Sequence, residues 1–223
     1  MIRNVIFDWS GTLVDDLEAV WRSTNYTLKK SGVPKMSLSE FRDEFSLPFD
    51  EFYARVTPGV SLDQLEVWYK ESFVKEQRSV QALPHSEAFF EFCRNEGMRT
   101  FLLSTIHPDH YRVQSQKVNF TFDREYVRVM DKRLKIRNIV EENNLSAGET
   151  IFIGDMQHDV ETAKAGGIFS CAVLTGYNTR RQLAAAQPDW IVENLSVLHQ
   201  QWEAHGASPV SYTHLTLPTI CSV

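Results

Sequence analysis

The chain has 223 residues and is 43% hydrophobic, which is enough for one substantial core or for a core with a smaller inserted domain. Its formal net charge of −6 and the absence of any Lys/Arg-rich block argue against tight binding to nucleic acid or to an anionic membrane. The three cysteines form no CxxC pair, no apolar run reaches about 18 residues, and the N-terminus already has a strand pattern. We therefore expect a cytoplasmic protein with reduced thiols, no signal peptide and no membrane partner.

Short apolar runs alternate along the chain with longer amphipathic stretches. The apolar runs predict buried strands at residues 4–8, 99–105, 126–130, 150–155, 171–176 and 189–194. Helical spacing predicts helices at residues 85–97, 131–145 and 159–167. Strands that alternate with helices form βαβ units, so we predict an α/β fold built on a parallel sheet.

Residues 17–82 depart from this alternation, because they show helical spacing and no convincing strand. A stretch of this length is far too long for a simple crossover between two strands. We therefore predict an α/β core made of residues 1–16 and 83–205, with residues 17–82 forming an inserted helical domain. The alternative is an extended helical face on the same core.

The tail at residues 206–223 matches neither pattern. From residue 208 onward it resembles the translated adapter sequences that end many proteins inferred from assembled reads. We leave it out of the fold prediction and expect it to be disordered.

Polar side chains follow several of the predicted strands, at the sheet edge where ligands bind in open parallel sheets. Asp8 ends the first strand, Ser104 follows the second, and Asp155 ends the fourth, with Asp159 one helical turn later. Lys132 lies just beyond the third strand. Carboxylates that share a crevice repel one another unless a cation neutralises them, and oxygen ligands without histidine favour Mg²⁺ over zinc. Taken singly, each residue also has a structural explanation as a turn residue, a helix cap or a helix N-terminal charge.

The stretches DWSGTLVD, LLST, a downstream lysine and IGDMQHD resemble, in this order, the four motifs of the haloacid dehalogenase-like hydrolase superfamily. The resemblance covers roughly residues 1–198 and is strongest to the phosphoglycolate phosphatase-like branch. It implies a Rossmann-like core, with the helical insert as a C1-type cap. It also implies a Mg²⁺-dependent phosphatase that acts on a small phosphorylated metabolite.

The resemblance assigns roles to the residues of the crevice. Asp8 would be the nucleophile that forms an aspartyl-phosphate. Asp8, Asp155 and the backbone carbonyl of Ser10 would hold Mg²⁺, which requires the two carboxylates to lie within about 8 Å of each other. Lys132 would place its charge against the nucleophile and the transferring phosphoryl group. Lys135 competes for this role, but Lys132 fits the motif register better.

Further residues are assigned to the metal and to the phosphate. Asp159 would complete the metal site by positioning the metal's waters or the motif lysine. Ser104, with Thr105 beside it, would bind a phosphoryl oxygen. Gly11 and Thr12 would shape the turn after the first strand and donate hydrogen bonds to phosphate.

Ser10 departs from the family pattern. The phosphatases of the family carry a second aspartate there, which protonates the leaving oxygen and then activates water. A serine hydroxyl has too high a pKa for either task, and general acid–base catalysis is typically worth ~10²–10⁴-fold. The interpretation favoured here is a phosphatase that is slow or whose acid role another group fills.

Two alternatives remain open. One is a phosphonoacetaldehyde hydrolase-like phosphonatase, whose DWAGT motif is close to DWSGT, although no match to its cap lysine segment surrounds Lys29, Lys30 or Lys35. The other is a non-catalytic sensor that binds phosphorylated ligands. Dehalogenases also lack an aspartate at this position, but their fourth motif lacks the pair formed here by Asp155 and Asp159.

The remaining polar residues near the motifs have structural explanations. His107 and His110 are expected to face solvent, with contact to substrate or service as a replacement acid as the less favoured alternative. His158 is expected to be exposed. Asp15 and Asp16 are expected to flank a hinge into the helical insert.

Overall fold

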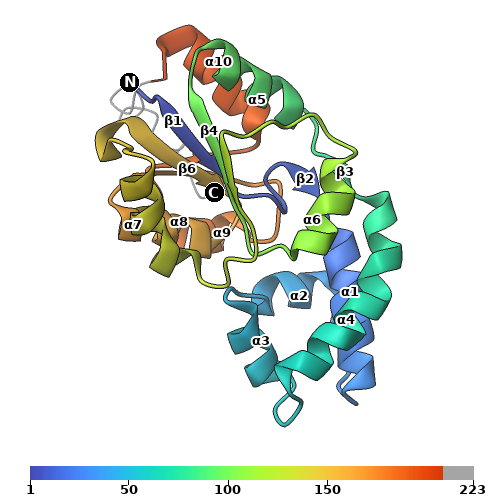
Figure 1. Cartoon of the computed structure of the whole chain (residues 1–223). Helices are drawn as coiled ribbons and strands as arrows, with labels where there is room; N and C mark the ends of the chain where they lie inside the picture. Colours follow the sequence, from blue (N-terminus) through green and yellow to red (C-terminus); the bar gives the residue numbers. More distant parts are fainter. Residues whose placement is uncertain (208–223) are drawn as a thin grey trace, which may run out of the picture.

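The computed structural model describes residues 1–207 and contains a six-stranded parallel sheet (Figure 1). In sheet order, the strands are β5 (Arg124–Tyr126), β4 (Arg99–Leu103), β1 (Asn4–Phe7), β6 (Thr150–Gly154), β7 (Phe169–Val173) and β8 (Trp190–Val192). β1 lies in the middle of the sheet and pairs in parallel with β4 and β6. The predicted α/β fold is thereby confirmed. Of the tail predicted to be disordered, residues 206 and 207 are described, and Ala207 is buried with its carbonyl accepting from Ile2 N at 2.6 Å. Residues 208–223 lie outside the described part of the chain.

Helices cover both faces of the sheet, namely α5 (Ser86–Asn95), α7 (Lys132–Glu142), α8 (Gln157–Gly166) and α10 (Leu195–His205). Successive residues of a strand point to opposite faces, so β1 contributes to two apolar clusters. Val5 and Phe7 pack in one cluster with side chains of α5 and α10, and Ile6 packs in another with side chains of α7 and α8. Figure 1 shows these two pairs of helices on opposite sides of the sheet. This burial holds the C-terminal ends of β1 and β6 at a fixed position.

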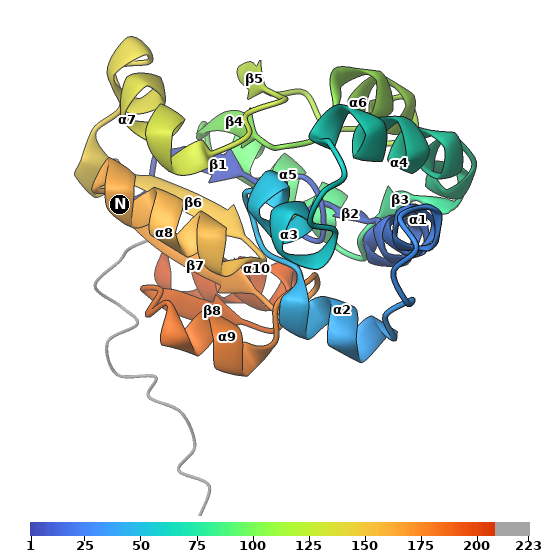
Figure 2. The same ribbon diagram turned by 90° about the horizontal axis from the view of Figure 1, so that it is seen from below.

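A helical segment, residues 17–76, interrupts the core and contains α1 (Leu17–Lys30), α2 (Leu38–Glu44), α3 (Phe49–Val56) and α4 (Leu62–Glu76). It lies between β2 (Val14–Asp15) and β3 (Gln81–Ala82), which pair antiparallel. α1 packs along α4, as Figure 1 and Figure 2 both show. Ser37 starts α2 with a capping box, because its hydroxyl accepts from Glu40 N while the Glu40 carboxylate accepts from Ser37 N. The segment lies at the end of the sheet where β1 and β6 terminate (Figure 1).

The remaining elements are short and include several that the sequence patterns did not predict: α6 (Pro108–Ser115), α9 (Arg180–Ala185), η1 (Gln77–Ser79) and η2 (Ala147–Glu149). The strand predicted at 126–130 instead ends at Tyr126. Arg128 adopts φ 59°, in the left-handed region, which a continuing strand cannot accommodate. Within residues 1–207, no helix combines the length and the apolar character needed to cross a membrane.

Candidate active site

Three carboxylates meet where two neighbouring strands end. Asp8 directly follows β1, Asp155 directly follows β6, and Asp159 lies in the first turn of α8. One oxygen atom of each carboxylate lies within 4.8 Å of the others, and all three side chains are buried. Because β1 and β6 are adjacent and parallel, their carboxyl ends lie at the same edge of the sheet. The separation is well inside the limit of about 8 Å for one bridging cation.

A single buried ammonium group lies among these carboxylates. Lys132 is the first residue of α7, and its Nζ lies 2.7 Å from Asp8 Oδ1 and 2.8 Å from Asp159 Oδ1. Lys135, one turn later, instead places its Nζ over the ring of Tyr126, 6.0 Å from the centroid. Of the two lysines considered from the sequence, Lys132 is therefore the one that touches the cluster.

The charges of this cluster do not balance, since three carboxylates surround one ammonium. Burial raises the pKa of Asp8 to about 6, although the charge of Lys132 opposes the shift. Burial, with repulsion from Asp159 and Asp8, raises the pKa of Asp155 well above its ordinary range. The excess negative charge and the all-oxygen donor set fit a hard divalent cation such as Mg²⁺.

Two glycines bring the backbone close to Asp155. A Cβ atom would lie 2.6 Å from Asp155 Oδ2 at Gly11 and 2.0 Å from it at Gly176, so neither position has room for a side chain. Tyr177 N donates to the same oxygen at 2.7 Å, and the Thr12 hydroxyl donates to Asp155 Oδ1 at 3.3 Å. These contacts fix the carboxylate that, with Asp8, would hold the metal.

Asp159 already has two partners within the protein. Its Oδ1 accepts from Lys132 Nζ, and its Oδ2 accepts from Met156 N at 3.0 Å. Of the two roles considered for Asp159, this geometry favours positioning the lysine over positioning the metal's waters.

Two polar groups of the turn after β1 have partners within the protein. Gly11 N donates to Val14 O at 2.9 Å, and Thr12 Oγ1 is engaged with Asp155. The Gly11 N–H and the Thr12 hydroxyl are therefore engaged within the protein, and the expectation that Gly11 and Thr12 donate hydrogen bonds to phosphate stays a prediction.

The end of β4 contributes the other two residues expected at the phosphate. Ser104 is buried, and its Oγ accepts from Ile106 N at 3.3 Å, which leaves the hydroxyl proton available to a phosphoryl oxygen. Thr105 lines the cavity above the cluster.

Ser10 is held by a carboxyl group that the sequence patterns assigned to a hinge. Its Oγ donates to Asp16 Oδ2 at 2.6 Å, and the Tyr177 hydroxyl donates to Asp16 Oδ1 at 3.0 Å. Asp16 stands at the N-cap position of α1 but makes no capping hydrogen bond with its side chain. It is buried, and burial raises its pKa to about 7. The Ser10 hydroxyl thus has a titratable partner in Asp16. The neighbouring Asp15 is exposed.

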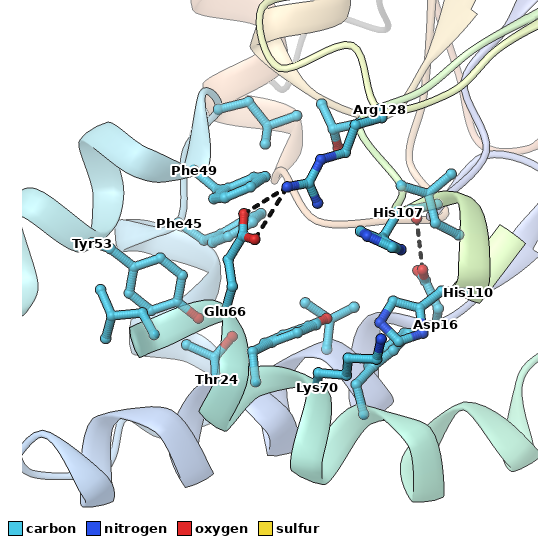
Figure 3. A pocket seen from close by; sticks show the side chains of 18 of the residues that line it. Asp16, Thr24, Phe45, Phe49, Tyr53, Glu66, Lys70, His107, His110 and Arg128 are labelled. Carbon is cyan, nitrogen blue, oxygen red and sulfur yellow. Dashed lines mark hydrogen bonds and ion pairs between the residues drawn. The ribbon is translucent and has the colours of Figure 1, made fainter. Parts of the chain in front are cut away.

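A cavity of about 380 Å³ lies between this cluster and the helical segment, with Asp8 and Ser10 among its lining residues (Figure 3). Aromatic side chains of the helical segment form much of its wall, including Phe45, Phe49 and Tyr53. The volume lies within the range of ligand pockets, ~300–1,000 Å³. The cluster therefore opens onto a space that can hold a small organic molecule.

The histidines differ from the positions expected for them. His107 and His110 line the cavity, where burial lowers the pKa of His110 to about 4 and that of His107 below its ordinary value. The expectation that His158 is exposed is wrong. It is buried where α7 and α8 pack together, and its Nε2 accepts from Lys132 N at 3.2 Å.

Comparison with known proteins identifies the fold and the motifs together. The sequence model of the haloacid dehalogenase-like hydrolase family matches residues 5–173, which include Asp8, Lys132, Asp155 and Asp159. The chain belongs to this family. The resemblance seen in the four motifs is confirmed.

Curated relatives of this hydrolase match it over nearly its whole length. It is 24% identical to a 5′-nucleotidase of Pseudomonas aeruginosa, over 91% of this chain and 96% of that protein. It is also 24% identical to a phosphoglycolate phosphatase of Synechococcus elongatus, over 89% of this chain and 96% of that protein.

Solved structures of the family share the fold of this hydrolase. A hydrolase from Pseudomonas syringae superposes with a TM-score of 0.79 at 15% identity, covering 92% of this chain and 100% of that one. CbbY from Rhodobacter sphaeroides, solved in complex with phosphate, superposes with a TM-score of 0.73 at 18% identity, covering 89% and 96%.

Sequence patterns missed Asp16 and Tyr177 as residues of the site. An aspartate before a helix is usually an exposed cap, and Tyr177 lies in a loop without a motif. Asp16 precedes α1 by one residue, so its position alone gave no sign that its side chain turns toward Ser10.

Proposed function

We propose that this hydrolase is a Mg²⁺-dependent phosphohydrolase that acts on a small phosphorylated metabolite through an aspartyl-phosphate intermediate. The observation that carries the proposal is the buried cluster of Asp8, Asp155, Asp159 and Lys132 beneath the cavity. The relatives named as phosphoglycolate phosphatase and 5′-nucleotidase support chemistry on phosphate esters.

Asp8 performs the attack. Its carboxylate forms a bond to phosphorus while the bond from phosphorus to the leaving oxygen breaks, which releases the alcohol and leaves phosphate on Asp8. Water then attacks phosphorus, and the bond to the Asp8 oxygen breaks to release inorganic phosphate. Lys132 remains beside Asp8 throughout and offsets the negative charge that gathers there.

The metal would be held by Asp8 and Asp155, with the backbone carbonyl of Ser10 as a further ligand. When bound, Mg²⁺ supplies the positive charge that lets an anionic nucleophile approach an anionic substrate. Asp159 fixes the ammonium of Lys132, and Ser104 offers its hydroxyl proton to a phosphoryl oxygen.

The leaving oxygen requires a proton, and Ser10 stands where the family's phosphatases carry the acid. The Ser10 hydroxyl has its proton directed to Asp16, so the leaving oxygen would take its proton from water or from another group that lines the cavity. The proposed enzyme is for this reason expected to turn over slowly.

The helical segment is proposed to act as a cap that encloses the leaving group. Its aromatic side chains line the cavity opposite the cluster, so the segment shields the reacting atoms from water.

The phosphonatase alternative needs an uncharged cap lysine to form a Schiff base. Lys70 is the lysine of the helical segment among the described residues that line the cavity, and its Nζ lies 3.2 Å from Asp109 Oδ2. The Lys70 amine is thus engaged with Asp109, which disfavours the alternative. The sensor alternative is supported by the absence of a carboxylate at Ser10.

Turnover of phosphorylated metabolites by the purified protein tests the proposal. Phosphate release is expected with Mg²⁺ and not with a chelator present. Asp8→Asn should abolish release while the protein stays folded, because the amide retains the shape of the side chain but is no nucleophile. Asp15→Asn is the matched control on an exposed neighbour and should retain activity. Phosphate release that persists in Asp8→Asn would show that another group attacks, and binding of phosphorylated ligands without any release would favour the sensor.

A further inference from the structure

The wall of the cavity is largely aromatic and aliphatic. The helical segment contributes Phe45, Phe49 and Tyr53 on one side, and Tyr69 with Phe73 from α4 on another. The rings of Tyr69 and Phe73 are stacked with centroids 5.1 Å apart. A leaving group as small as glycolate would leave most of the cavity of about 380 Å³ unfilled, whereas an aromatic ring would contact these rings.

The charges along the same wall disfavour an anionic leaving group. Among the residues that the structure describes, the cationic side chains that line the cavity are Lys70 and Arg128, and each already has an acidic partner. Arg128 Nη2 donates to both carboxylate oxygens of Glu66, at 3.0 and 3.1 Å, as Figure 3 shows. Lys70 is paired with Asp109.

Acidic groups also line the cavity, because Asp16, Asp63 and Glu66 face it in addition to Asp8. The two imidazoles that line it add no positive charge near neutral pH, since burial lowers the pKa of His110 to about 4 and that of His107 below its usual value. A carboxylate on the leaving group would therefore meet like charges without a free cation to balance it.

We infer that the substrate is a phosphate monoester whose leaving alcohol carries an aromatic ring and no anionic group. This inference rests on the proposed phosphatase function. It separates the substrate from phosphoglycolate, whose leaving group is small and carries a carboxylate.

Equilibrium binding to the Asp8→Asn variant tests the inference without requiring turnover. Phenyl phosphate and 4-carboxyphenyl phosphate are a matched pair that differ in the carboxylate, and ethyl phosphate tests the contribution of the ring. With Mg²⁺ present, titration calorimetry should give phenyl phosphate the lowest Kd, with 4-carboxyphenyl phosphate and phosphoglycolate weaker by about tenfold or more. Ethyl phosphate should also bind more weakly than phenyl phosphate, because it lacks the ring contacts.

A charge variant then tests the cause of the selectivity. In the Asp8→Asn background, Glu66→Gln removes the anionic partner of Arg128. The Kd of 4-carboxyphenyl phosphate should then fall about fivefold relative to the Kd of phenyl phosphate. Glu71→Gln is the matched control, since Glu71 lies on the same helix and is exposed, outside the cavity lining. It should leave the ratio unchanged.

Several results overturn the inference. One is that 4-carboxyphenyl phosphate or phosphoglycolate binds as tightly as phenyl phosphate, or more tightly. Others are that ethyl phosphate binds as tightly as phenyl phosphate, or that phenyl phosphate does not bind. A last one is that Glu66→Gln leaves the ratio of the Kd values of 4-carboxyphenyl phosphate and phenyl phosphate unchanged. Failure of the proposed function gives a different result, because the wild-type protein would then release phosphate from none of the esters. Binding selectivity as described, together with no turnover, supports the inferred ligand class and rejects the enzyme.

Discussion

At the scale of single residues, the stability of the site depends on the ammonium group of Lys132, which is buried among its carboxylates. Lys132 is fully buried and contacts both Asp8 and Asp159, and Asp159 has its second oxygen bound to a backbone N–H. Removing one partner from such a network leaves buried charge without compensation, which costs more than the network contributes when complete.

Lys132→Met is therefore expected to lower the free energy of unfolding by about 3 kcal/mol or more in the absence of metal. Lys135→Met, the matched control one turn along α7, should change it by less than about 0.5 kcal/mol, because Lys135 lies outside the cluster. Urea denaturation of both variants provides the measurement. Equal effects of the two substitutions would show that the ion pairs of Lys132 do not hold the cluster together.

Ser10→Asp restores the carboxyl group that the first motif lacks. Phosphatase turnover should rise, within the ~10²–10⁴-fold that general acid–base catalysis supplies. The new carboxylate would face Asp16 across the present hydrogen bond of 2.6 Å, so the apoprotein should lose stability. The loss should be smaller at pH 6 than at pH 8, since Asp16, with a pKa of about 7, can be protonated there and donate to the new group.

Steady-state kinetics and thermal melts at the two pH values measure both effects. Ser10→Asn is the control, because it has a similar shape but cannot transfer a proton, and its turnover should not rise. A fall in turnover on Ser10→Asp would mean that wild type already has a substitute acid, with Asp16, His107 and His110 as the residues to mutate next.

At the scale of elements, the loop between β7 and α9 matters as much as the strands that end in aspartates. Gly176 lies in this loop against Asp155, and the neighbouring Tyr177 contributes both an N–H to Asp155 and a hydroxyl to Asp16. The loop thus supports the metal ligand and the partner of Ser10 together.

Gly176→Ala should consequently displace Asp155, because the added Cβ would lie 2.0 Å from its Oδ2. We expect loss of Mg²⁺ binding and of activity, with a smaller effect on the fold. Gly148→Ala is the control, since a Cβ there meets nothing within 4 Å. Calorimetric titration with Mg²⁺ measures the affinity of both variants. Unchanged Mg²⁺ affinity in Gly176→Ala would show that the contact with Gly176 does not hold Asp155 as a metal ligand.

At the scale of the whole molecule, the buried carboxylates link folding to pH and to metal. Burial raises the pKa of Asp8 from 3.8 to about 6, so the folded state binds this proton more tightly than the unfolded state does. Without metal, the contribution of Asp8 to stability therefore falls as pH rises from about 4 to about 6 and stays low above that. His110 and His158, with pKa values lowered to about 4, contribute with the opposite sign over the same range.

Comparing the Tm with and without Mg²⁺ at one pH cancels the histidine contributions and leaves the stabilisation by the metal. Saturating Mg²⁺ should raise the Tm by about 5 °C or more at pH 7.5. The rise should be smaller at pH 5, where protons compete for the carboxylates. Asp155→Asn should abolish it. An equal rise at both pH values, or one that survives Asp155→Asn, would locate the metal elsewhere.

The sequence by itself determined the α/β class and which residues meet at the sheet edge. Each strand is a local apolar run, and Asp8 and Asp155 stand directly at the ends of two such runs. Parallel pairing then brings the two carboxylates together, whatever the details of packing. The position of Asp159 follows equally from the spacing of one helical turn.

Tertiary structure alone decided the surroundings of these residues. Asp16 and Tyr177 are 161 positions apart, and no local pattern indicates that their side chains meet. The burial of His158 required α7 to pack against α8, and Arg128 left the strand pattern through its left-handed backbone. Periodicity records only which face of an element is apolar, whereas contacts between distant elements depend on how those faces pack. Chemistry at the strand ends was therefore visible in the sequence, but the partner of Ser10 and the walls of the cavity were not.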